Sequence, residues 1–165
     1  MTPALHDKAS QLVALCKAKK LTITTAESCT GGLVAAAITS VSGSSDVFER
    51  GFVTYSDEAK TEMIGVNAAL IAKYGAVSEE TARAMAEGAQ QAAKADIAVA
   101  VTGIAGPTGG SPSKPVGLVF IATARSAMLC REFRFGNPGR EEVRVQSALE
   151  ALQMLLDQAA TGGGP

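Results

Sequence analysis

Apolar residues recur every three to four positions near both ends of the chain. Near the N-terminus they are Leu5, Ala9, Leu12, Val13 and Cys16. Near the C-terminus they are Val145, Leu149, Leu152, Leu156 and Ala159. This spacing places each set on one face of a helix. We therefore expect an amphipathic helix at the start of the chain and another over residues 140–160, with Gly162 where a helix commonly stops.

Short β-branched or apolar runs between these two helices predict strands. They cover residues 21–25, 52–55, 97–102, 116–124 and 129–135. The run IAVAVT at residues 97–102 is apolar throughout, which is typical of a strand buried on both faces. The last two runs are separated by a short link at residues 125–127, which favours a β-hairpin.

Helices are expected between the strands. Residues 31–41 are apolar and rich in alanine, residues 57–63 begin with two acids, and Ser78 can cap a helix that runs to about Lys94. Strands that alternate with helices and end in a hairpin predict an α/β fold. We expect one domain over residues 1–165, a three-layer α/β/α sandwich whose mixed sheet is mostly parallel with one antiparallel strand.

Composition narrows the classes of function. The net charge of -1 gives no signature of a nucleic-acid-binding surface. No run approaches the ~18 apolar residues that a membrane span needs, and the first residues lack the pattern of a secretory signal. Cys16, Cys29 and Cys130 are widely spaced with no CxxC, which argues against disulfides or a zinc site. We expect a cytoplasmic protein that binds neither nucleic acid nor membrane.

Two loops at predicted strand ends are candidates for binding a ligand, because open α/β sheets bind ligands at the carboxyl ends of their strands. Their candidate residues are Ser28, Thr30, Gly31, Gly32, Gly103, Ile104, Ala105 and Gly106. Glycines allow close approach of the backbone, and a helix start offers N–H groups to a phosphate. Alternatively, the glycines only make tight turns and Ser28 or Thr30 caps a helix, which spacing alone favours. Neither loop matches a Walker A or dinucleotide-binding motif.

Ser44, Ser45, Tyr55 and Lys60 form a second candidate group. A serine hydroxyl needs a base, and the only histidine, His6, is far away in the sequence. A desolvated Lys60 could act as that base, and Tyr55 could relay a proton or orient the lysine. The alternative is that the serines make a turn, Tyr55 lies at an edge, and Lys60 is a solvated charge.

Arg140 and Cys29 are two further candidates. Arg140 follows a Gly-Asn-Pro-Gly turn and could bind a phosphate bidentately, or it could form a surface salt bridge with a glutamate. Cys29 could be a thiolate at a helix start, but without a histidine partner a small buried thiol is favoured. The SxxK pattern at residues 111–114 lies in a Gly/Pro-rich loop and is attributed to chance.

Several segments together resemble the C-terminal domain of the competence/damage-inducible CinA proteins. They include TTAESCTGG, SGSSDVFERGFVTYSDEAK, GAVSEETA, VTGIAGPTGGSPSKPVGLV and FGNPGREEVR, in the same order, over residues 5–156. The resemblance is closest to the stand-alone form of that domain. It implies hydrolysis of the carboxamide of nicotinamide mononucleotide to nicotinic acid mononucleotide and ammonia, in the recycling of pyridine nucleotides.

The resemblance also implies a metal-independent serine amidohydrolase without a cofactor. It assigns catalysis to Ser45, Tyr55 and Lys60, and leaves the two loops and Arg140 to bind the nucleotide. It further implies a homo-oligomer, a dimer or higher. Two other functions stay open from the residues: a non-catalytic nucleotide-binding or regulatory module on the same fold, and an amidase for another small amide.

Overall fold

A five-stranded mixed sheet forms the centre of the protein. The computed structural model describes residues 1–161, so the expected helix stop at Gly162 lies outside the described residues. The strands lie in the order β2 (Phe48–Val53), β1 (Ile23–Glu27), β3 (Ile97–Gly103), β4 (Leu118–Ala124) and β5 (Met128–Arg134). β1 is parallel to β2 and β3, whereas β4 is antiparallel to β3 and β5. Four strands therefore run in one direction and β4 in the other, as predicted.

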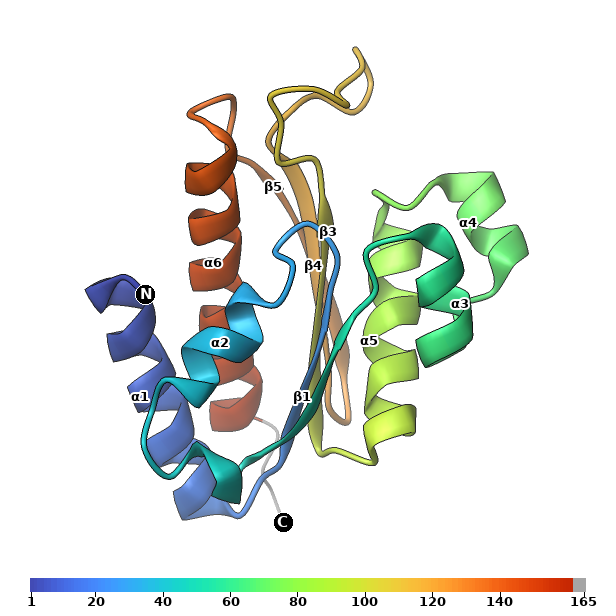
Figure 1. The fold of residues 1–165 in the computed structure, drawn as a ribbon. Helices are drawn as coiled ribbons and strands as arrows, with labels where there is room; N and C mark the ends of the chain where they lie inside the picture. The colour runs from blue at the N-terminus through green and yellow to red at the C-terminus, as the bar shows by residue number, and fades with distance from the viewer. Residues whose placement is uncertain (162–165) are drawn as a thin grey trace.

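Helices cover both faces of the sheet (Figure 1). One face carries α1 (Pro3–Lys19), α2 (Leu33–Thr39) and α6 (Arg140–Thr161), and the other carries α5 (Glu79–Ala93) with the shorter α3 (Asp57–Ile64) and α4 (Ala68–Tyr74). The predicted three-layer α/β/α sandwich is confirmed. Among residues 1–161, every helix is too short or too polar to cross a membrane.

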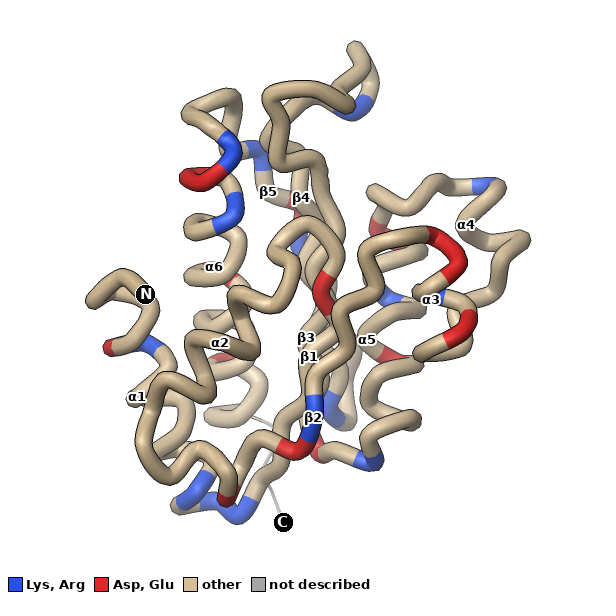
Figure 2. Tube along the Cα trace, viewed as in Figure 1, with Lys and Arg blue, Asp and Glu red and all other residues tan. Residues whose placement is uncertain are grey.

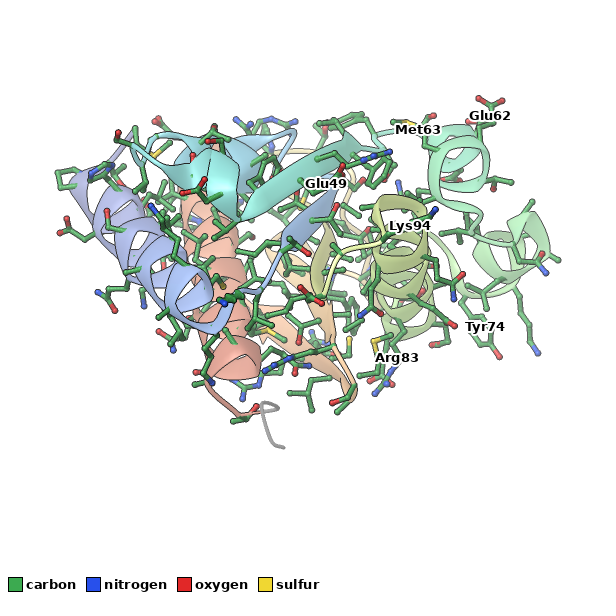
Figure 3. The ribbon with its side chains drawn as sticks, turned by 90° about the horizontal axis from the view of Figure 1, so that it is seen from below. Glu49, Glu62, Met63, Tyr74, Arg83 and Lys94 are labelled. Atoms are coloured by element: carbon green, nitrogen blue, oxygen red, sulfur yellow. The ribbon has the colours of Figure 1, made fainter. Side chains whose placement is uncertain are left out.

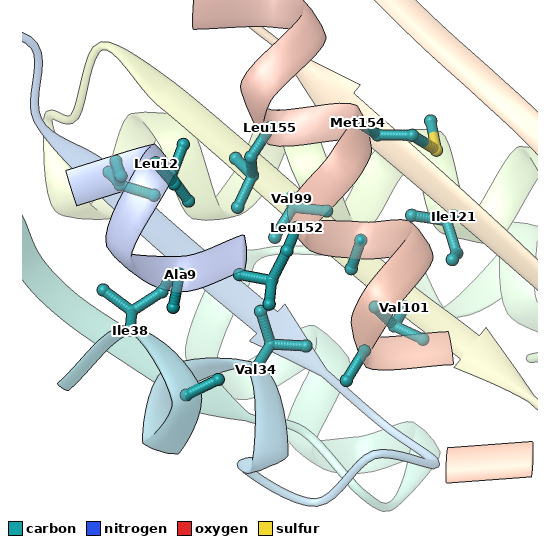
Figure 4. Packing of buried hydrophobic residues seen from close by; sticks show 14 of the residues in the cluster. Ala9, Leu12, Val34, Ile38, Val99, Val101, Ile121, Leu152, Met154 and Leu155 are labelled. Carbon is teal, nitrogen blue, oxygen red and sulfur yellow. The ribbon is translucent and has the colours of Figure 1, made fainter. Parts of the chain in front are cut away.

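The two halves of the core differ in the size of their side chains. On the α1/α6 side, large aliphatic residues of the helices such as Leu12, Leu152 and Leu155 pack against valines and an isoleucine of the sheet (Figure 4). The α5 side is built mainly from alanine on both the helix and the strands. Gly88 of α5 lies so close to α3 that a Cβ there would be 2.0 Å from the carbonyl oxygen of Ile64. α5 therefore packs tightly against both the sheet and α3.

Local signals in the sequence account for most element boundaries. The Oγ of Ser78 accepts a hydrogen bond from the N–H of Thr81 and caps α5, as predicted. The apolar face predicted for the first helix is buried, and a tight turn joins β4 to β5. Two predictions differ: β2 begins at Phe48 and not at residue 52, and α4 was not expected. The seven residues of α4, capped by Asn67, are too few to show a helical period.

Candidate active site

A pocket of about 270 Å³ opens at the carboxyl ends of β1 and β3. That volume is close to the lower end of the range for small-molecule sites, roughly 300–1,000 Å³. Eight of the twelve predicted site residues line it: Ser28, Tyr55, Lys60, Gly103, Ile104, Ala105, Gly106 and Arg140. The structure thus brings the glycine-rich loop after β3 and the predicted lysine to one place, next to the loop after β1.

Ser28 and Lys60 are in direct contact in this pocket. The Nζ of Lys60 lies 3.1 Å from the Oγ of Ser28. Ser28 directly follows β1, and its N–H donates to the carbonyl of Val101 in β3. The chain returns beside β1 as β2, where Thr54 N–H donates to the Glu27 carbonyl, and α3 then carries Lys60 back to the strand end. Residues 32 positions apart therefore meet because two parallel strands are neighbours.

Lys60 is completely buried, so the alternative of a solvated surface lysine is wrong. Its Nζ also donates to the carbonyl of Thr54 at 2.7 Å, and at 3.4 Å to the carbonyls of Tyr55 and Ser56. No carboxylate of residues 1–161 forms a salt bridge with it. By contrast, Met63 on the same helix is exposed, and it projects outward with Glu62 (Figure 3).

Burial lowers the pKa of Lys60, because the ammonium ion loses its hydration. The nearby Asp57, and secondarily Cys29, oppose this shift. The Nζ of Lys60 donates to the Oγ of Ser28 and to the carbonyl of Thr54. The site therefore pairs a buried lysine of lowered pKa with the Ser28 hydroxyl.

Tyr55 and Arg140 meet at the edge of the pocket. Arg140, the first residue of α6, donates from Nη2 to the Tyr55 hydroxyl at 3.0 Å and from Nη1 to the Gly106 carbonyl at 2.8 Å. Among residues 1–161 it forms no salt bridge, so the alternative of a glutamate partner is wrong. Figure 2 shows basic residues together with acidic ones at this end of α6. Tyr55 contacts Lys60 Nζ through its carbonyl and not its hydroxyl.

Ser45 does not lie with Tyr55 and Lys60. It is exposed in the 3₁₀ turn η1 (Ser44–Asp46), whose Asp46 pairs with Lys17 at 3.2 Å. This turn precedes β2, whereas Tyr55 and Lys60 follow it. At ~3.3 Å per residue, β2 separates the two ends by on the order of 20 Å. The prediction that the three residues gather is therefore wrong within one chain, because β2 is longer than the sequence indicated.

The carboxylate of Glu27 binds the N–H groups at the start of α2, which the sequence analysis proposed as a phosphate site. This carboxylate is fully buried and accepts from the N–H groups of Val34 (2.8 Å) and Ala35 (3.0 Å). It also accepts from the Oγ1 of Thr30 at 2.6 Å. The N-terminal N–H groups of α2 are thus occupied by Glu27, which satisfies both these donors and the helix dipole.

Thr30, Gly31 and Gly32 consequently do not line the pocket, contrary to prediction. Thr30 is buried against Glu27, and Gly31 and Gly32 adopt φ values of 59° and 104° in the turn. The glycines therefore serve the tight turn, as the alternative held. The residue at the N-cap is Gly32, so neither Ser28 nor Thr30 caps α2.

Arg144 supports the same loop from the opposite side, which the sequence did not reveal. Its Nε donates to the Cys29 carbonyl at 3.2 Å and its Nη2 to the Thr30 carbonyl at 2.9 Å. The N–H groups of Cys29 and Thr30 donate to no backbone carbonyl of residues 1–161. One signal could have pointed to Arg144: it follows Arg140 by one helical turn and so lies on the same face of α6.

Cys29 is buried beside Ser28, and burial raises the pKa of its thiol to about 12. A thiol in this state is not the reactive thiolate, so the prediction of a small buried thiol is confirmed. Residues 1–161 contain no group of three or more histidine, cysteine, aspartate or glutamate side chains arranged to hold a metal ion.

Comparisons with known proteins cover nearly the whole chain. Residues 5–159 match the family model of the CinA C-terminal domain. The chain is 55% identical over 144 residues to the nicotinamide-nucleotide amidohydrolase PncC of Escherichia coli K12, covering 86% of this chain and 87% of that protein. It is 49% identical over 155 residues to a CinA-like protein of Syntrophus aciditrophicus, covering 93% of this chain but only 37% of that longer protein.

A solved structure has the same fold. The competence/damage inducible protein CihA from Agrobacterium tumefaciens superposes with a TM-score of 0.93 at 46% sequence identity. The match covers 95% of this chain and 96% of that one. The likeness therefore extends over nearly the whole chain.

Proposed function

Because this chain belongs to the family of CinA C-terminal domains, we propose that it hydrolyses the carboxamide of nicotinamide mononucleotide to nicotinic acid mononucleotide and ammonia. The observation that carries the proposal is the buried Lys60 amine, 3.1 Å from the Ser28 hydroxyl in a small-molecule pocket. A relative with 55% sequence identity is a nicotinamide-nucleotide amidohydrolase by name. The proposed reaction would serve the recycling of pyridine nucleotides.

In the proposed mechanism, Ser28 is the nucleophile in place of Ser45. Its Oγ attacks the amide carbon while neutral Lys60 takes the hydroxyl proton. The tetrahedral intermediate then breaks its C–N bond, and the Lys60 ammonium gives that proton to the leaving nitrogen, which departs as ammonia. Water attacks the resulting Ser28 ester with Lys60 again as base. The proton returns to Ser28, and the free acid leaves.

The oxyanion needs donors close to Ser28. The N–H groups of Cys29 and Thr30 are the candidates, because they directly follow the nucleophile and donate to no backbone carbonyl of residues 1–161. A backbone N–H fixed in this way stabilises the charge that develops on the carbonyl oxygen. Loss of one such donor costs roughly 10²–10³-fold in kcat.

Arg140, Tyr55 and the loop from Gly103 to Gly106 are proposed to hold the ribose and phosphate. Two of the five N–H donors of Arg140 are used by Tyr55 and Gly106, which leaves others for a phosphate. Since the Tyr55 hydroxyl accepts from Arg140, its contacts support a role in binding more than the expected relay of protons to Lys60.

Arg140→Ala is expected to raise KM for nicotinamide mononucleotide at least roughly tenfold, as for a lost charge-assisted hydrogen bond. It should lower kcat much less, because a remote phosphate is held equally in the ground and transition states. Steady-state kinetics would check this split. Arg131→Ala, an exposed arginine on β5, is the control and should behave as wild type. An unchanged KM for Arg140→Ala would remove the arginine from the phosphate site.

Ammonia release from nicotinamide mononucleotide, with EDTA present and no added metal, tests the function itself. We expect turnover of the mononucleotide and far less of nicotinamide or its riboside, which lack the phosphate that Arg140 would bind. Equal turnover of all three would indicate an amidase for other small amides. Binding of the mononucleotide without any ammonia would indicate a non-catalytic nucleotide-binding module.

We also propose that the chain acts in the cytoplasm as a homo-oligomer, a dimer or higher. The resemblance to self-associating domains and the partly exposed apolar side chains of Val53 and Leu129 support this state. Sedimentation equilibrium of the purified protein would test it, and a monomer at micromolar concentration would contradict it.

A further inference from the structure

Arg144 holds the loop after β1 without lining the pocket. Its guanidinium is half-buried and forms no salt bridge within residues 1–161. Its hydrogen bonds go to two consecutive backbone carbonyls, those of Cys29 and Thr30. The neighbouring residues Val143 and Ser147 are fully buried, so α6 presents Arg144 from a fixed backbone. A half-buried arginine whose hydrogen bonds go to two main-chain oxygens invites a functional explanation.

Peptide geometry supplies that explanation. In a planar trans peptide, the carbonyl of one residue and the N–H of the next point in opposite directions. When Arg144 fixes the Cys29 carbonyl, it also fixes the direction of the Thr30 N–H, away from the guanidinium. That N–H donates to no backbone carbonyl of residues 1–161. The second bond, to the Thr30 carbonyl, fixes the next peptide, whose Gly31 N–H donates back to Ser28 O at 3.0 Å.

We propose that Arg144 is a positioning residue: it sets the peptide groups after Ser28 in the orientation that stabilises the oxyanion. This rests on the proposed function. Glu27 holds the other side of the loop through the Thr30 hydroxyl, so the loop is fixed between a carboxylate and a guanidinium. Gly31 fits the same arrangement, because its φ of 59° lies in the left-handed region that favours glycine.

Replacing Arg144 should therefore affect mainly kcat, whereas replacing Arg140 should affect mainly KM, although the two residues lie one helical turn apart. Arg144→Ala is expected to lower kcat roughly 10²-fold with KM changed less than about threefold, the typical effect of a misplaced catalytic group. Arg144→Lys should recover only part of kcat, since an ammonium cannot reproduce the planar fork of the guanidinium. A KM effect in place of a kcat effect would make Arg144 a substrate-binding residue and overturn the proposal.

Arg125→Ala is the matched control. Its guanidinium also donates to two consecutive backbone carbonyls, those of Gln158 and Ala159 near the other end of α6. It should lose stability, as Arg144→Ala does, but keep kcat. If both variants lost kcat equally, the effect would be structural and the proposal wrong. Dilute guanidinium, far below unfolding concentrations, should restore part of the kcat of Arg144→Ala and none of that of a Ser28 variant.

A readout independent of nucleotide turnover separates this inference from the proposed function. A fluorophosphonate labels activated serines, and attack of the serine at phosphorus also creates an oxyanion. The rate at which it labels Ser28 should therefore be lower in Arg144→Ala than in wild type by a factor of roughly ten or more. If the wild type did not deamidate the mononucleotide but was still labelled faster than Arg144→Ala, the proposed substrate would be wrong. The positioning role of Arg144 would still be supported. Equal labelling rates of the two proteins would reject the role of Arg144.

Discussion

Replacing Ser28 with alanine should abolish deamidation of nicotinamide mononucleotide, with a loss in kcat on the order of 10⁴-fold or more, as for other nucleophilic serines. The reason is that the Ser28 Oγ is the hydroxyl that Lys60 Nζ contacts in the pocket. The alanine variant should still fold and bind the nucleotide, because Ser28 contributes only one hydroxyl to a formed site. Measurement of kcat together with nucleotide affinity would check both expectations.

Ser45→Ala is the matched control for Ser28→Ala. Ser45 is exposed before the start of β2, at the opposite end of that strand from Tyr55 and Lys60, so this variant should keep wild-type kcat. The assignment would be overturned if Ser45→Ala lost activity while Ser28→Ala retained it. In that event Ser45 would have to reach Lys60 from a second copy of the chain. Mixing Ser45→Ala with Lys60→Met protein would then restore activity.

Lys60→Met should also abolish turnover, with an expected loss of roughly 10²–10⁴-fold in kcat for removal of a general base. Methionine keeps the length and burial of the side chain but cannot accept a proton. Nucleotide binding should survive, since Lys60 is assigned to proton transfer and Arg140 to the phosphate. Turnover at a tenth of wild type or more would mean that another group acts as the base.

Lys60→Met also tests how the buried lysine affects the pH dependence of stability. The pKa of Lys60 is lowered in the folded protein, while that of an unfolded lysine is about 10.4. Between the two values the unfolded chain binds more protons, so wild-type stability rises with pH across this window. Below the lowered pKa, the folded protein carries the full cost of a buried ammonium ion.

The free energy of unfolding of wild type, relative to Lys60→Met, should therefore increase as pH rises toward about 10.4. Urea unfolding of both proteins at several alkaline pH values would measure it. Lys73→Met, which removes an exposed lysine on α4, should give a curve parallel to wild type. A parallel curve for Lys60→Met as well would show that burial does not perturb this lysine.

Much of the fold could be predicted because local signals and periodicity agree with the final packing. The apolar face of α1, the continuous run of β3 and the Ser78 cap of α5 each specify their element without knowledge of distant residues. In α6 the helix was predicted but its inner face only in part, because Val145, Leu149 and Leu156 are partly buried at the border of the face that packs on the sheet. Where the prediction failed, local preference was weak. β2 is an edge strand, and its first half contains Glu49, Arg50 and Gly51. None of these is a β-branched or aromatic residue typical of strands, so the sequence did not indicate where β2 begins.

The site was harder to predict because its contacts cross between elements. Tyr55, Lys60, Arg140 and the loop after β3 could be selected by residue type and by their place after strands. The partner of Lys60 could not be selected, since contact with Ser28 depends on β2 lying beside β1. Glu27 offered one overlooked signal: a charged residue at the end of a fully buried strand needs a local partner, and α2 supplies it.

The alanine side of the core ties the position of Lys60 to α5, a helix that contributes no residue to the pocket. Gly88 leaves no room for a methyl group against Ile64, so any larger residue there would push α3 outward and carry Lys60 away from Ser28. In the α1/α6 half of the core the side chains are larger, so a substitution that changes their volume slightly can be absorbed by repacking of neighbouring side chains. We therefore expect substitutions at Gly88 to damage turnover before they unfold the protein, whereas other buried positions of α5, such as Thr81 and Met85, already carry larger side chains.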